Sequence, residues 1–260
     1  MAIKKSIAKL SHSSFWLISK VYNFLNAILS GFWLGVMSEK SLDFSDELYY
    51  QRSKRYMDDR YNQSGLFEWE KERIKKYFSK AKSILLIAAG GGREALALSK
   101  MGFEVDSYEC NQLLIEYGNR LLQKNNIGSK IKYLQRNAVP GEIMKYDGII
   151  IGWGAYSLIR GSKRRLLFLE RLYPFLQKET PLMISFLTSA EHGRQDKIIK
   201  YVSNFFRIIS NRDKTEPGDR LVPDFAHFFT EEEIKSELGQ SKFKVVDYYN
   251  FDYGCIICII

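Results

Sequence analysis

Residues 84–112, ILLIAAGGGREALALSKMGFEVDSYECNQ, constrain the fold of this chain more than any other stretch. An apolar run stops at three consecutive glycines, a helical pattern follows, and a second apolar run ends at Glu109. Glycines between a strand and a helix let the backbone approach a ligand closely, and the amides that start the helix carry partial positive charge. An acid that ends the next strand is well placed to accept hydrogen bonds from ribose hydroxyls. The stretch therefore predicts a strand–helix–strand unit that binds a dinucleotide or S-adenosylmethionine (SAM) at its glycine turn.

Residues 66–80 have the pattern of an amphipathic helix. After this helix, strand-like and helix-like segments alternate. The expected strands lie at 83–89, 104–109, 131–136, 147–153, 181–187, 243–250 and 253–260, and the expected helices at 92–101, 111–125, 163–176, 193–207 and 230–238. This alternation favours an α/β fold with a doubly wound, mostly parallel sheet that carries helices on both faces.

The C-terminal stretch 242–260, KFKVVDYYNFDYGCIICII, contains two apolar runs separated by only a few residues. A parallel crossover needs a dozen or more residues, so these two strands are expected to pair antiparallel. Cys255 and Cys258 lie three apart in the last run, where strand geometry points them to opposite faces. We therefore expect two core residues rather than a redox pair. With only three cysteines in the chain, a reduced, cytoplasmic location is favoured.

A seven-stranded parallel sheet finished by a reversed hairpin resembles the class I SAM-dependent methyltransferases, and the resemblance covers residues 80–260. The first motif of that family is acid-x-Gly-x-Gly-x-Gly, and the corresponding stretch here is LIAAGGG. Gly90 and Gly92 match the last two glycines, Ala88 replaces the first, and Leu86 stands where the family has an acid. Glu94, in GGGREA, is a candidate for the missing carboxylate.

The resemblance implies SAM as cofactor, S-adenosylhomocysteine (SAH) as product, and a set of binding residues. Glu109 would take the ribose role, and Asn137 with Ala138 would take the place of the family's adenine-contacting Asp and small residue. An Asn carbonyl can accept from an exocyclic amine; the alternative is that Asn137 only caps the turn before Pro140. The residues expected to contact the cofactor are Ala88, Ala89, Gly90, Gly91, Gly92, Glu94, Glu109, Cys110, Asn137, Ala138, Gly152, Trp153 and Gly154.

Three side chains are candidates for a general base, should the acceptor need to lose a proton. His192 follows the fifth expected strand and His227 precedes the last expected helix, and both can act near neutral pH. Tyr156 is a third, weaker candidate. The alternatives are that both histidines make only local hydrogen bonds and that Tyr156 packs against a helix. No cysteine and histidine spacing indicates a metal site, and none is expected.

The N-terminal 65 residues are expected to form a helical extension to a catalytic domain at 66–260. Helices before the first strand often close over SAM in the resembling family, and Tyr56, Tyr61 and Trp69 are candidates for aromatic walls of the substrate site. Residues 15–37 are strongly apolar but are interrupted by Lys20, Asn23 and Asn26. Four interpretations stay open for them: a membrane-spanning helix, a helix on a membrane surface, a helix packed on the domain, and a homodimer contact.

These observations favour methyl transfer to an oxygen or nitrogen atom of a small molecule or peptide. A net charge of +9 keeps a nucleic-acid methyltransferase as an alternative, although the basic residues are dispersed and no RNA-binding module is recognisable. Leu86 and Ala88 motivate a second alternative, a non-catalytic interaction protein of methyltransferase type. An NAD-dependent oxidoreductase is disfavoured by the reversed hairpin and by the lack of a clean GxGxxG motif.

Overall fold

The computed structural model of the chain describes residues 2–251 and 253–260, with side chains from residue 6 onward. Its sheet runs in the order β3 (Ile131–Tyr133), β2 (Glu104–Glu109), β1 (Ser83–Ile87), β4 (Gly148–Ile151), β5 (Leu182–Thr188), β9 (Gly254–Ile259) and β8 (Lys244–Asn250). The first five strands are mutually parallel, and β9 is antiparallel to both of its neighbours. The expected doubly wound sheet with a reversed C-terminal hairpin is therefore confirmed.

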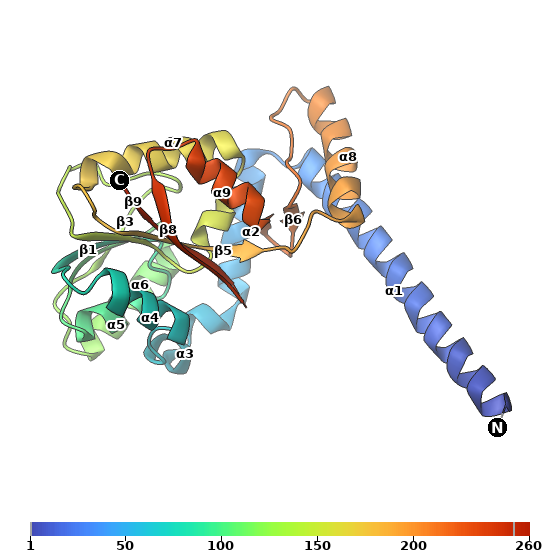
Figure 1. The fold of residues 1–260 in the computed structure, drawn as a ribbon, viewed down its shortest axis with the longest axis horizontal. Helices are drawn as coiled ribbons and strands as arrows, with labels where there is room; N and C mark the ends of the chain where they lie inside the picture. The colour runs from blue at the N-terminus through green and yellow to red at the C-terminus, as the bar shows by residue number, and fades with distance from the viewer. Residues whose placement is uncertain (1, 252) are drawn as a thin grey trace.

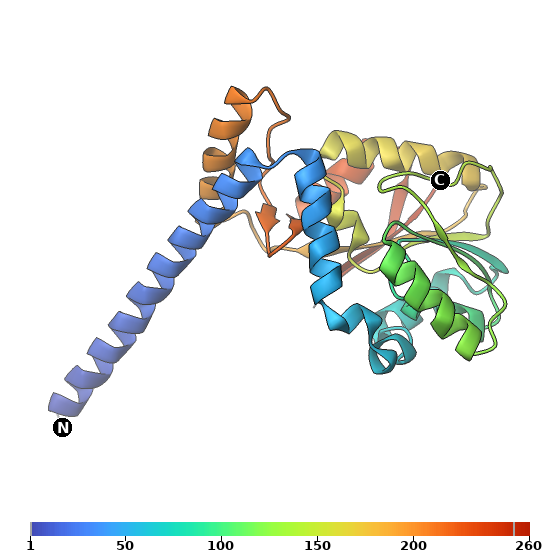
Figure 2. The same cartoon turned by 180° about the vertical axis from the view of Figure 1, so that it is seen from behind.

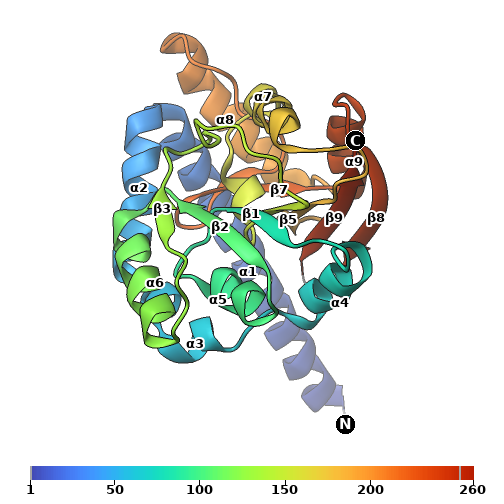
Figure 3. The ribbon, with the colours of Figure 1, turned by 90° about the vertical axis from the view of Figure 1, so that its left-hand side faces the viewer.

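Helices cover both faces of this sheet, as Figure 3 shows along its edge. One face packs against α4 (Glu68–Tyr77), α5 (Arg93–Lys100) and α6 (Gln112–Lys124), and the other against α7 (Ser162–Leu172) and α9 (Glu231–Gly239). Successive strand residues alternate between the two cores. Cys255 lies in the first core and Cys258 in the second, as expected.

Two short strands that the sequence did not predict extend the sheet beyond the tip of β5. These are β6 (Asp219–Leu221) and β7 (Phe225–Phe229), which form an antiparallel pair. β7 runs parallel to the last residues of β5 through the pairs Leu187 with Phe228 and Thr188 with Phe229. The hairpin connects the helix α8 (Arg194–Ile209) to α9, and it carries His227 into the interior.

The N-terminal extension contributes two separate pieces. Helix α1 (Ala2–Val36) projects from the body, and only its last turns lie beside α8 (Figures 1 and 2). Helix α2 (Glu39–Arg52), a short 3-10 turn (Lys54–Met57) and α3 (Asp59–Gln63) instead run along the body of the protein toward α5 and α6. None of the described helices is both long and apolar enough to span a membrane.

Candidate functional site

The main candidate site is a cavity at the carboxyl ends of β1, β2 and β4, with about 860 Å³ of empty space that is partly open to solvent. Open parallel sheets bind ligands at this edge. Seven of the residues predicted to contact the cofactor line it: Ala88, Gly90, Glu109, Cys110, Asn137, Ala138 and Trp153. The sequence prediction therefore identifies one side of a real cavity.

The residues of the glycine turn have different physical roles. Gly90 has φ +55° and open space where a Cβ would stand, and it lines the cavity. Gly91 has no room, because a Cβ there would lie 2.1 Å from the carbonyl oxygen of Tyr56. Gly92, with φ +95°, is the N-cap of α5. Ala88 has φ +62°, so it adopts the left-handed backbone that the family's glycine would provide.

Glu109 ties the glycine turn to the end of β2. One carboxylate oxygen accepts from the Gly90 amide at 2.8 Å, and the other accepts from the amides of Cys110 and Asn111 at 2.8 and 3.0 Å. A carboxylate offers about four lone-pair sites, so three amide donors leave capacity for a ligand hydroxyl. The next residue, Asn111, caps α6 through the Leu114 amide. This geometry fixes an acceptor group at the cavity wall.

The adenine side of the predicted site is built by the segment after β3. Asn137 has φ +58°, and Ala138 follows it in the cavity wall. Arg136 also lines the cavity and forms an ion pair of 2.6 Å with Asp46 of α2. Burial raises the pKa of Asp46 to about 6, although Arg136 opposes the shift. Arg136 was missed from the sequence, and its only signal is its place directly before Asn137.

The other predicted cofactor residues shape the turn without lining the cavity. Ala89 donates its amide to the Tyr108 carbonyl. Glu94 is buried, pairs with Arg93 at 2.7 Å, and accepts from the Trp153 amide at 3.1 Å. Gly152 allows the end of β4 to lie close to the Ala88 carbonyl. A Cβ on residue 152 would lie 2.1 Å from that carbonyl oxygen.

Gly154, with φ +71°, donates its amide to the Ser185 hydroxyl. Together with Gly91 and Gly92, these residues act on the backbone rather than on the ligand space.

The predicted aromatic walls are only partly present. Tyr56 lines the cavity together with Tyr50, and their rings are 5.2 Å apart edge to face. Tyr61 lies outside the lining, with the Arg55 guanidinium 4.9 Å from its ring. Trp69 of α4 is buried in the core, where it stacks on Tyr249. The substrate role of Tyr61 and Trp69 thus loses its geometric basis, because neither reaches the cavity.

None of the three candidate bases lines the cavity. His227 is fully buried, with Nδ1 2.7 Å from Asp219 and Nε2 3.1 Å from Glu233, and His192 Nε2 lies 2.9 Å from the same Glu233. Burial opposes the charged ring of His227, but the two carboxylates outweigh it and raise its pKa to about 9. Tyr156 is also buried and donates to Glu237 at 2.7 Å.

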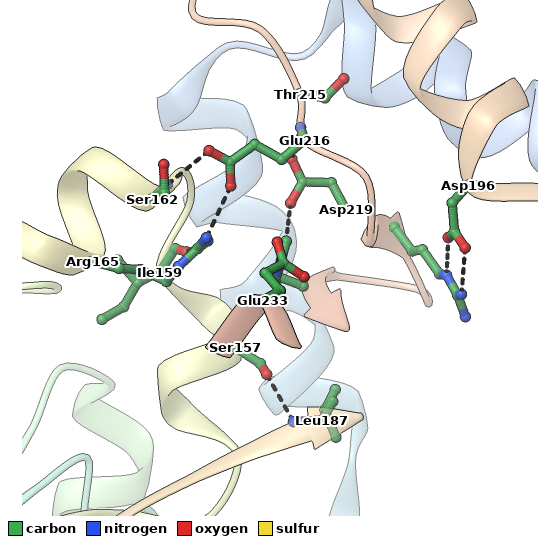
Figure 4. Close-up of polar contacts among 12 residues, drawn as sticks. Ser157, Ile159, Ser162, Arg165, Leu187, Asp196, Thr215, Glu216, Asp219 and Glu233 are labelled. Atoms are coloured by element: carbon green, nitrogen blue, oxygen red, sulfur yellow. Dashed lines mark hydrogen bonds and ion pairs between the residues drawn. The ribbon is translucent and has the colours of Figure 1, made fainter. Parts of the chain in front are cut away.

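Glu216, Asp219 and His227 bring potential metal ligands within 4.8 Å of one another. Figure 4 shows how the protein itself engages the acids of this cluster. Glu216 accepts from the Ser162 amide at 2.9 Å and from Arg165 at 2.9 Å, while Asp219 accepts from the Glu216 amide at 2.8 Å. The cluster is therefore hydrogen-bonded internally, and we assign no metal to it.

Cys110 is the one cysteine in the cavity wall among the described residues. Burial raises the pKa of its thiol to about 12, with a further contribution from the neighbouring Glu109. The thiol is protonated at neutral pH, so Cys110 acts as a neutral wall residue rather than as a nucleophile.

Comparison with known proteins supports this geometry. Residues 49–152 match the family model described as "Tellurite resistance protein TehB". None of the curated proteins matches the chain. Among solved structures, a SAM-dependent methyltransferase from Methanosarcina mazei is similar with a TM-score of 0.57 and 17% identity, covering 75% of this chain and 98% of its own.

Two further structures have the same fold. TehB from Haemophilus influenzae is similar with a TM-score of 0.55 and 14% identity, over 77% of this chain and 66% of its own. The glycopeptide N-methyltransferase MtfA, solved with SAM, gives a TM-score of 0.52 and 12% identity, over 73% of this chain and 86% of its own. The chain therefore has the fold of these SAM-dependent methyltransferases, and its residues 49–152 match the TehB family model.

Proposed function

We propose that this protein transfers a methyl group from SAM to an oxygen or nitrogen atom of a small-molecule or peptide acceptor. The observation that carries the proposal is the cavity at the ends of β1, β2 and β4, where Gly90, Glu109 and Asn137 meet. It lies at the edge of the sheet where open parallel sheets bind ligands.

The residues present fit SAM. Gly90 leaves open space at the turn, Glu109 presents a carboxylate already oriented by three amides, and Asn137 offers an amide side chain at the third strand. When bound there, SAM supplies a methyl group on a positively charged sulfur. The departure at Ala88 preserves the backbone of the turn, and Leu86 is a core residue of β1 that is turned away from the cavity wall. These two observations favour a catalytic protein over a non-catalytic one.

Aromatic side chains form much of the cavity wall and would enclose the reacting groups. Tyr50, Tyr56, Tyr108, Trp153 and Phe168 line the cavity, and aromatic faces attract cationic groups. They exclude water and align the acceptor, which is the main contribution a protein makes to a direct displacement. Since His192, His227 and Tyr156 lie outside the wall, we assign them a structural role and no proton transfer. The acceptor is then a group that is nucleophilic without a protein base, such as an amine or an acidic hydroxyl.

A label-transfer experiment tests the acceptor class. The full chain is incubated with methyl-labelled SAM in three separate reactions. The first contains a mixture of catechols and small amines, the second a tryptic peptide digest, and the third total RNA. The proposal predicts label in the catechol and amine mixture or in the peptides, and loss of that label in Glu109→Ala. Glu104→Ala, an exposed acid at the other end of the same strand, is the matched control and keeps the activity. Label in RNA alone would refute the proposed acceptor class in favour of the nucleic-acid alternative.

A further inference from the structure

Helix α1 presents an unusual surface for a globular protein. Residues 6–25 are exposed all along the helix, and the ribbon shows them projecting from the body (Figures 1 and 2). The exposed side chains include Trp16 at 61%, Leu25 at 57% and Trp33 at 47% of their full areas. Single exposed apolar residues need no explanation, but a contiguous apolar patch marks an interaction site.

The last turns of α1 are fixed on α8 through small residues. Ala27, Gly31 and Gly35 are spaced four apart, and a Cβ on Gly31 or Gly35 would lie 2.9 Å from α8 atoms. Arg207 of α8 donates to the Leu34 carbonyl at 2.9 Å. The helix is therefore held at its C-terminal end, so the direction in which it projects is set by the fold.

The two sides of α1 differ. Ser19, Asn23, Asn26 and Ser30 follow one another at helical spacing of four, three and four residues, and Ser30 accepts from the Leu221 amide at 3.0 Å. Exposed apolar residues centre on the other side, and further ones flank the polar row: Leu17, Ile18, Val21, Leu25, Ile28, Leu29 and Phe32 on the other side, and Phe15, Trp16, Tyr22 and Trp33 beside the row. A helix with a narrow polar row and a broad apolar surface is suited to lie along a membrane surface.

Helix α8 continues the apolar surface beside α1. Tyr201, Phe205, Ile208 and Ile209 are exposed on it, and the Phe206 ring lies 5.3 Å from the Phe32 ring of α1. We define the α1–α8 surface as the exposed apolar residues of these two helices.

The charge of helices α1 and α8 indicates which kind of partner the α1–α8 surface binds. The sequence from residue 2 to 36 contains lysines but no Asp or Glu. Lys9 is exposed, and Lys20 lies with its Nζ 3.5 Å from the Trp16 ring. The one acid in α8, Asp196, is buried and paired with Arg220 at 2.8 Å. We infer that the α1–α8 surface docks on an anionic phospholipid membrane, with α1 lying in the interface. Apolar area and basic charge together are what such binding requires.

Vesicle cosedimentation of the full chain tests this inference. Vesicles of phosphatidylcholine alone are compared with vesicles that contain 30% phosphatidylglycerol. Two exposed lysines predict binding about 30-fold tighter to the anionic vesicles. The double variant Trp16→Ser/Leu25→Ser removes two exposed side chains that support no core, and it should weaken binding by at least about 100-fold. The matched control Tyr133→Ser/Met144→Ser removes two exposed side chains of the catalytic domain and should bind as the wild type does.

Two further measurements separate the membrane from a second copy of the chain. Brominated lipids should quench the fluorescence of Trp16, and the quenching should decrease in Trp16→Phe, which still binds vesicles. Light scattering should give a mass near 30.3 kDa in solution. The inference is overturned if anionic vesicles are not bound, if both vesicle types bind equally, or if the wild type is a dimer that the double variant dissociates.

Discussion

Alanine at Gly90 and alanine at Gly91 should both weaken ligand binding, but for different physical reasons. In Gly91→Ala the new Cβ would stand 2.1 Å from the Tyr56 carbonyl oxygen and 3.0 Å from Asn62 Oδ1. Real Cβ contacts are essentially never shorter than 3.0 Å, so Tyr56 would have to retreat by at least 0.9 Å, the difference between the two distances. Overpacking of this kind costs about 1–3 kcal/mol.

The displaced segment is the one that carries a cavity wall. The Tyr56 carbonyl accepts from Asn62 Nδ2 at 3.0 Å, so this bond is strained by the same movement. Because Tyr56 lines the cavity, a loss of about 1–3 kcal/mol there lowers the SAH affinity of Gly91→Ala by about 5- to 150-fold. Amide hydrogen exchange in residues 54–63 should rise in the same variant.

Gly90→Ala should behave differently. Its Cβ meets no protein atom within 4 Å and enters the ligand space, so the affinity falls by direct obstruction. The strain of φ +55° costs about 1 kcal/mol of stability, and exchange in residues 54–63 should stay as in the wild type. Gly141→Ala, at an open position with an ordinary φ, is the control. The reasoning is wrong if Gly91→Ala binds SAH like the wild type with unchanged exchange in residues 54–63.

Three further predictions concern stability. Ala88→Gly relieves the positive φ of Ala88 and should raise the free energy of unfolding in urea by about 0.5–1 kcal/mol, after the entropic cost of glycine is subtracted; a lowered value would contradict the strain. The pKa of His227 is raised from 6.5 to about 9, so its stabilising contribution is complete below pH 6.5 and is lost as the pH rises through 9. The difference in unfolding free energy between wild type and His227→Asn should therefore shrink by up to about 3 kcal/mol from pH 6 to 10, and a constant difference would exclude a charged ring. Arg165→Met leaves the buried Glu237, now paired at 2.7 Å, without its cation and should lower stability by about 3–5 kcal/mol; a neutral result would show that Glu237 finds another partner.

The regular part of the fold could be predicted because its signals are local. Each strand of the main sheet and each helix after residue 66 follows its own hydrophobic period, and the short spacing at the C-terminus forces the reversed hairpin. The pair β6 and β7 could not be predicted in this way. Its strands are three and five residues long, and they exist because they add to the tip of β5.

The cavity wall was predictable where a residue ends a strand, as Glu109 does, or lies within a few positions of the strand end, as Asn137 does. It was not predictable where a distant segment decides the role. Gly91 appears in the sequence as a ligand-binding glycine, yet the atom that excludes its Cβ belongs to Tyr56, which is 35 positions away. His227 was missed for another reason. Its partners Asp219 and Glu233 are only 8 and 6 positions away, but the β6–β7 hairpin that buries the ring was not predicted.

A calorimetric titration of the purified full chain with SAH, beside the Glu109→Ala variant, tests the central claim most directly. We expect saturable binding of one SAH per chain with a dissociation constant on the order of micromolar, and loss of that binding in Glu109→Ala while the Glu104→Ala control binds normally. Absence of SAH binding by the folded wild type would show that the cavity is not a SAM site and would favour a non-catalytic role for this fold.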